Sequence, residues 1–91
     1  MTTQRLIRFV TVRETTGLSR STIYLRINDG LFPPPIAIGP RSVAWPEAEV
    51  AALNAARIRG ASDDDIRALV IELVAARQIA EMVNEAEEES K

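Results

Sequence analysis

The sequence predicts a mainly α-helical domain with a small β-hairpin, followed by a long C-terminal helix. Three observations lead to this prediction: two short helix signals separated by a glycine, a proline-rich segment followed by two short apolar runs, and a final stretch from Ala61 to Lys91 without glycine or proline. The chain has 91 residues, 46% hydrophobic and 26% charged, which suffices for one small domain and an appended helix. A core of this size is often stabilised by self-association.

The first two helices are predicted from their terminal residues. Thr11-Val12-Arg13-Glu14 has the pattern of a capping box and predicts a helix over about residues 12–16. Gly17 is expected to end it, because glycine adopts the left-handed conformation at little cost. Ser19 is a preferred N-cap and predicts a second helix over about residues 20–29. Two helices joined by a tight turn with glycine are typical of a helix-turn-helix.

A β-hairpin is predicted after the second helix. The three prolines at positions 33–35 cannot continue a helix, because they lack an N–H donor and favour extended geometry in the residue before them. The apolar runs 36–38 and 43–45 flank a turn that contains glycine and proline, which predicts two short strands. Arg41 lies at the tip of this hairpin. A helix-turn-helix followed by such a hairpin is a winged helix-turn-helix.

Two further helices follow the hairpin. Pro46 fits the first position of a third helix that ends at Gly60, and Ser62 is a suitable N-cap for a fourth. We therefore divide the chain into a winged helix-turn-helix over residues 1–59 and an acidic, amphipathic helix over residues 60–91. Consecutive carboxylates at the start of the fourth helix are interpreted as partners of the helix dipole rather than as a metal site.

The fourth helix has an apolar stripe with the spacing of a coiled coil. Such a stripe can pair two copies of the chain, or it can fold back onto the winged domain. We expect a homodimer or higher homo-oligomer, because so small a core is not expected to cover the whole stripe. The residues assigned to oligomerisation are Ile66, Leu69, Val70, Leu73, Ala76, Ala80 and Val83.

Charge is distributed unevenly along the chain. The formal net charge is −2, but residues 1–59 hold eight arginines against four carboxylates, whereas residues 60–91 hold three cations against nine carboxylates. The first part is therefore basic and the second acidic, which indicates different roles. Arginine suits phosphate groups and guanine edges better than lysine does.

The basic winged helix-turn-helix predicts double-stranded DNA as the partner. The second helix is expected to enter the major groove with its polar side chains outward, and nearby arginines are expected to contact phosphates. The candidate residues on this recognition helix are Ser19, Arg20, Ser21, Thr22, Tyr24, Arg26 and Asn28. Those expected to contact the backbone from the wing and the N-terminal segment are Arg41, Ser42, Arg5, Arg8 and Arg13. Phe9, Phe32 and Trp45 are assigned to the hydrophobic core.

Several of these residues together resemble the AlpA-like family of phage and prophage regulators, which is related to excisionases and to the MerR-type winged helix. The resemblance covers about residues 5–58. It rests on Leu18-Ser19-Arg20-Ser21-Thr22-Ile23-Tyr24, Gly30, Phe32-Pro33-x-Pro35, Gly39-x-Arg41, Trp45 and Glu49. It implies a sequence-specific DNA-binding regulator of prophage or integrase-linked genes, or an excisionase that bends attachment-site DNA.

Composition argues against other classes of protein. Without cysteine or histidine, the chain lacks disulfides, the usual zinc ligands and the commonest general base, so we expect neither an enzyme nor a bound cofactor or metal. No apolar run could cross a bilayer and no signal peptide is recognisable, so a cytoplasmic, nucleoid-associated protein without a membrane partner is expected. An alternative is an adaptor whose acidic helix binds a basic partner, such as an integrase or RNA polymerase.

Overall fold

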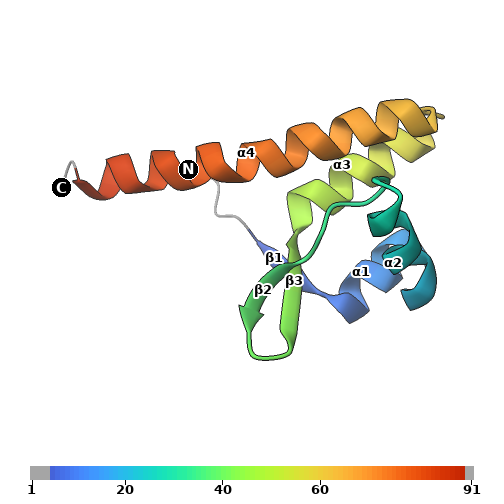
Figure 1. Ribbon diagram of the computed structural model, residues 1–91, viewed down its shortest axis with the longest axis horizontal. Coiled ribbons are helices and arrows are strands. Elements are labelled where there is room, and N and C mark those ends of the chain that lie inside the picture. Colours follow the sequence, from blue (N-terminus) through green and yellow to red (C-terminus); the bar gives the residue numbers. More distant parts are fainter. Residues whose placement is uncertain (1–4, 90–91) are drawn as a thin grey trace.

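The computed structural model describes residues 5–89, with side chains as far as Gln78, as four helices and a three-stranded antiparallel sheet (Figure 1). This arrangement confirms the predicted winged helix-turn-helix with a long C-terminal helix. Within the described residues, no helix combines the length and the apolarity that membrane crossing requires. In chain order the elements are β1 (Leu6–Arg8), α1 (Phe9–Thr16), α2 (Arg20–Asn28), β2 (Ile36–Gly39), β3 (Ser42–Pro46), α3 (Glu47–Ile58) and α4 (Asp63–Glu89).

Helix α1 begins earlier than predicted. It starts at Phe9, and its N-cap is Arg8, which makes no side-chain capping bond. The predicted capping box at Thr11 and Glu14 is therefore wrong, because both residues lie inside the helix. The physical reason is the preceding strand: pairing with β3 holds Arg8 in an extended conformation, and the helix follows it directly.

The turn between α1 and α2 is as predicted. Gly17 has a φ of 74°, and its N–H donates to the carbonyl oxygen of Arg13 at 2.8 Å. Ser19 is the N-cap of α2, where its Oγ accepts a hydrogen bond from the N–H of Thr22 at 3.2 Å. A glycine C-cap followed closely by a serine N-cap thus sets the angle between the two helices.

The sheet contains one strand that the sequence analysis did not predict. Strand β3 lies in the centre, with β1 on one side and β2 on the other. The predicted hairpin forms β2 and β3, and Ile36 is paired with Ala44. The missed strand β1 places Ile7 opposite Trp45. Because β1 has three residues, of which Ile7 alone is buried, it carries too little alternation to be recognised.

The core is organised around Trp45, which is fully buried. Its indole N–H donates to the carbonyl oxygen of Pro33 at 2.9 Å, so the proline-rich segment is attached to the centre of the fold. Phe32 is buried and packs edge-on against Trp45, as expected of a core residue. Phe9 is only half-buried, although its ring also meets Trp45 edge-on, with 5.4 Å between ring centres.

Helix α4 packs along α3 and contributes to the same core (Figure 1). It begins at the predicted cap, since Ser62 Oγ accepts a hydrogen bond from the N–H of Asp65 at 3.2 Å. Ile66 is fully buried and Val70 is 7% exposed. Their assignment to oligomerisation is corrected: they pack inside their own chain, because α3 covers one side of α4. Leu69 and Leu73 pack against the edge of that core.

The remaining positions of the stripe have a different environment. Ala76 is exposed, and the side chains of Ala80 and Val83 lie outside those that the structure describes.

A buried ion pair joins α4 to α3 and to the proline-rich segment. Arg77 donates to both carboxylate oxygens of Glu49, at 2.8 and 2.6 Å, and to the carbonyl oxygen of Pro34 at 3.0 Å. The side chain of Glu49 is 7% exposed and that of Arg77 is 21% exposed. Glu49 of α3 therefore holds α4 in place through this ion pair.

Candidate nucleic-acid interface

Helix α2 presents a polar face to solvent, as the sequence predicts. Ile23 is fully buried and anchors the inner side of the helix. On the outer side, Ser21 and Asn28 are exposed and Leu25 is 61% exposed, while Tyr24, on the flank of the helix, is 43% exposed. One surface of α2 is thus available along its whole length, which insertion into a major groove requires.

The hydroxyl groups at the start of α2 bind one another. Ser19 Oγ donates to Thr22 Oγ1 at 2.8 Å and lies 3.3 Å from Ser21 Oγ. It also accepts the hydrogen bond that caps the helix. The predicted DNA-contacting residues Ser19 and Thr22 therefore form part of the cap of α2, whereas Ser21 is the more exposed member of the group.

Three of the predicted arginines line one hollow between α2 and the wing. Arg8 comes from the junction of β1 and α1, Arg20 is the first residue of α2, and Arg41 lies in the turn of the hairpin. The hollow has a volume of about 300 Å³ and is also lined by Phe9 and Tyr24. No carboxylate occurs among the described residues around it, so its charge is uniformly positive.

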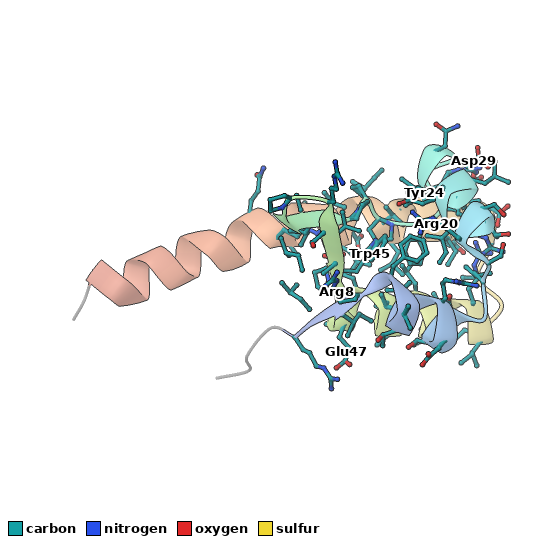
Figure 2. All side chains as sticks on the ribbon, turned by 90° about the horizontal axis from the view of Figure 1, so that it is seen from below. Arg8, Arg20, Tyr24, Asp29, Trp45 and Glu47 are labelled. Atoms are coloured by element: carbon teal, nitrogen blue, oxygen red, sulfur yellow. The ribbon has the colours of Figure 1, made fainter. Side chains whose placement is uncertain are left out.

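Arg20 rests on two aromatic rings. Its guanidinium carbon lies 4.9 Å from the ring centre of Phe9 and 5.7 Å from that of Tyr24. The two rings are themselves 5.5 Å apart. Figure 2 shows Arg20 and Tyr24 on the side of α2 that faces Trp45. These cation–π contacts restrict the guanidinium and orient it towards the hollow.

Arg41 has an unusual backbone conformation. Its φ is 61°, which makes it the one non-glycine residue with positive φ in the described part of the chain. It follows Pro40 in the two-residue turn of the hairpin, a place where glycine or asparagine is normally favoured. Such strain is typical of functional positions. Ser42, also predicted to contact DNA, is half-buried at the start of β3.

The other predicted arginines do not join this group. Arg5 lies 3.6 Å from the carboxylate of Glu47 in an exposed ion pair. Arg13 lines a separate hollow beside the α1–α2 turn, together with Glu14. Arg26 is half-buried and lines a third hollow, next to Arg57. The structure thus brings Arg8, Arg20 and Arg41 together and leaves these three elsewhere.

Ion pairing distinguishes the arginines of the hollow from several other arginines of the molecule. Within residues 5–78, salt bridges join Arg5 to Glu47, Arg57 to Asp63, Arg67 to Asp64 and Arg77 to Glu49. Over the same residues, the three arginines of the hollow have no carboxylate within salt-bridge distance. Their charges remain available to an external anion.

Sequence reasoning missed the contribution of Phe9 to this site. Phe9 was assigned to the core alone, yet its ring supports the guanidinium of Arg20. The spacing of Arg20 and Tyr24, one helical turn apart, indicates that these two side chains can meet. No spacing in the sequence indicates that Phe9 joins them, because the position of Phe9 depends on the unpredicted strand β1.

Comparison with known proteins gives concordant results. The family model described as prophage CP4-57 regulatory protein (AlpA) matches residues 5–57. An uncharacterised protein of Enterobacteria phage P4, ORF88, is 47% identical over 60 residues, which is 66% of this chain and 68% of that protein. No solved structure matches. The matched region contains all three arginines of the hollow and the whole helix-turn-helix, and the chain belongs to the AlpA family of phage regulatory proteins.

Proposed function

We propose that this protein binds double-stranded DNA at specific sequences and regulates the transcription of phage or prophage genes. The observation that carries the proposal is the hollow lined by Arg8, Arg20 and Arg41, next to the exposed face of α2. Its uniform positive charge is complementary to the phosphate backbone. Membership of the AlpA family, whose description names a prophage regulatory protein, supports the same function.

The dimensions of α2 suit the major groove. A helix with its side chains is about 10–12 Å wide, and the groove is about 12 Å wide. With Ile23 turned inward, Ser21, Leu25 and Asn28 are the outward residues that would meet base edges. Serine and asparagine can hydrogen-bond to bases, and leucine can contact the methyl group of thymine. The wing would then lie on the adjacent backbone, which accounts for an arginine at its tip.

Selection of duplexes from a random library by the full-length chain tests the proposal. We expect a preferred site whose log affinity falls with log salt at a slope of about −0.9 for each phosphate neutralised. Replacement of Arg8 and Arg41 by alanine should make that slope shallower. A matched control is Arg59→Ala and Arg67→Ala together, which removes two exposed arginines and leaves the hollow intact. Failure to enrich any sequence, or an affinity insensitive to salt, would contradict the proposal.

The bend of the bound duplex distinguishes a regulator from an excisionase. An excisionase must bend attachment-site DNA, whereas a regulator can bind a straight operator. Placing the selected site at different positions along a fragment and comparing gel mobilities of the complexes measures this bend. We expect mobility to be independent of position; a strong dependence would favour the excisionase role.

We also propose that copies of the protein associate through the far half of α4. Within the described side chains, Val74 is the last hydrophobic residue of α4 that packs against the core, and Ala76 beyond it is exposed. In the sequence, the stripe continues through Ala80 and Val83, and Figure 1 shows α4 running well past the sheet. Two linked winged helix-turn-helix domains would bind one operator more tightly than a single domain does.

Sedimentation velocity over a range of concentrations tests this association. The substitution Val83→Asp places a charge on the stripe and should shift the protein towards monomer. Ala75→Asp adds the same charge at an exposed position outside the stripe and should not. A wild-type protein that remains monomeric at all concentrations would exclude this mode of pairing.

A further inference from the structure

The arginines of the hollow converge although nothing in the described part of the chain neutralises them. They come from three different elements, β1, α2 and the β2–β3 turn, and each is exposed to solvent. Like charges around one hollow repel one another, and an anion bound among them would relieve that repulsion. The fold therefore prepares a site for a negatively charged group at the junction of recognition helix and wing.

The orientation of Arg20 determines which anion this is. As the first residue of α2, Arg20 could extend along the groove to a guanine, as the sequence suggests. Instead its guanidinium lies over Phe9, 4.9 Å from the ring centre, and Phe9 is fixed in turn against Trp45. Arg20 thus lines the same hollow as Arg8 and Arg41. Guanidinium groups bind phosphate oxygens through paired hydrogen bonds, and several around one group match its several oxygens.

We propose that Arg8, Arg20 and Arg41 together bind a single phosphodiester group of the DNA backbone, so that Arg20 positions the duplex and does not read a base. This inference rests on the proposed DNA-binding function and specifies the ligand of one site within it. The strained backbone at Arg41, with a φ of 61°, is consistent with phosphate binding, because such strain is retained at positions where the side chain has a function. Base discrimination then depends on the outward residues Ser21, Leu25 and Asn28.

Neutralising single phosphates tests the proposal directly. A methylphosphonate group, which has no charge, replaces each phosphate of the selected duplex in turn, and the affinity of the full chain is measured for each. We expect one position at which the wild-type protein loses affinity about tenfold or more. At that same position, Arg8→Ala, Arg20→Ala and Arg41→Ala should each show less than about a twofold loss, because the shared contact is already weakened.

Two further variants make the result specific. Arg20→Gln removes the charge but keeps a longer polar side chain than alanine, and it should behave like Arg20→Ala, which separates loss of the charge from truncation of the side chain. Arg59→Ala removes an exposed arginine outside the hollow and should retain the full wild-type sensitivity. Thermal unfolding of each variant, followed by circular dichroism, verifies that the fold is retained.

The three possible results of these binding experiments lead to different conclusions. If the three variants lose sensitivity at the same phosphate, the shared site is supported. If Arg20→Ala instead relaxes the preference at one base pair and keeps the wild-type phosphate pattern, Arg20 reads a base and the inference is wrong. If the wild-type protein binds no duplex, the proposed function itself fails, a result distinct from the second.

Discussion

The two sides of the molecule use arginine in opposite ways. On the α3–α4 side, Arg57, Arg67 and Arg77 each contact a carboxylate of the same chain. On the side of α2 and the wing, the three arginines that line the hollow contact no carboxylate within residues 5–78. The first set stabilises the fold and the second is available to bind a ligand. Pairing with a carboxylate therefore distinguishes these two sets of arginines.

The largest effect is expected on the α3–α4 side. Arg77→Ala leaves the buried carboxylate of Glu49 without a partner and should lower the free energy of unfolding by about 3 kcal/mol. Asp64→Asn, which removes an exposed ion pair, should change it by less than about 0.5 kcal/mol. Urea denaturation followed by circular dichroism measures both. A loss below 1 kcal/mol for Arg77→Ala would show that the pair does not hold α4 in place.

The next prediction separates capping from DNA contact at the start of α2. Ser19→Ala removes the cap and should lower stability by about 1 kcal/mol, whereas Ser19→Gly should cost only a few tenths. If Ser19 acts only as a cap, Ser19→Gly should bind the selected duplex within about twofold of wild type. If Ser19→Gly loses more affinity than this at unchanged stability, Ser19 contacts DNA as well as capping the helix.

A similar effect, on binding rather than stability, is expected at Leu25. Its exposed side chain on the outer face of α2 can cover a thymine methyl group, a contact worth about 1 kcal/mol. Replacing thymine by uracil at single positions of the duplex should weaken wild-type binding at one of them, and Leu25→Ala should abolish that difference. Ile58, at the end of α3, is 86% exposed and provides the control Ile58→Ala. Equal sensitivity of wild type and Leu25→Ala would contradict the assignment.

The smallest effect on stability is expected for Arg41→Gly, which should change stability and DNA binding in opposite directions. Arg41→Gly relieves the positive φ and should raise stability by about 0.5 kcal/mol, the relief being partly offset by the greater flexibility of glycine. The melting temperature should then rise by about 2–4 °C. The same substitution should weaken DNA binding, because it removes one arginine of the hollow. Melting curves and binding isotherms on one preparation reveal whether the two changes have opposite signs.

Much of the fold could be predicted from local signals. Gly17, Ser19 and Ser62 mark helix boundaries through backbone chemistry that acts within a few residues, and the structure confirms all three. Strand β1 could not be predicted, because three residues that pair with a strand about forty positions away carry no local pattern. The error at Thr11 has the same origin, since β1 moves the start of α1 to Phe9.

The candidate site was predictable in its residues but not in their grouping. Arginine content and helix spacing indicated Arg8, Arg20 and Arg41 among other candidates. Their meeting in one hollow depends on the β1–β3 pairing and on the strained turn at Arg41, which are tertiary properties. The apolar stripe of α4 was likewise predictable. Which of its residues are buried in the core depends on how α3 packs against α4, which the sequence does not indicate.

The contacts that connect Trp45 through Phe9 to Arg20 have a practical consequence. Phe9 touches Trp45 at one edge and supports Arg20 with its face, and Trp45 is the single tryptophan of the chain. An anion bound by Arg20 would therefore lie two side chains away from the indole. We expect the ultraviolet emission of Trp45 to change when the arginine hollow is occupied, which would report binding without an added dye.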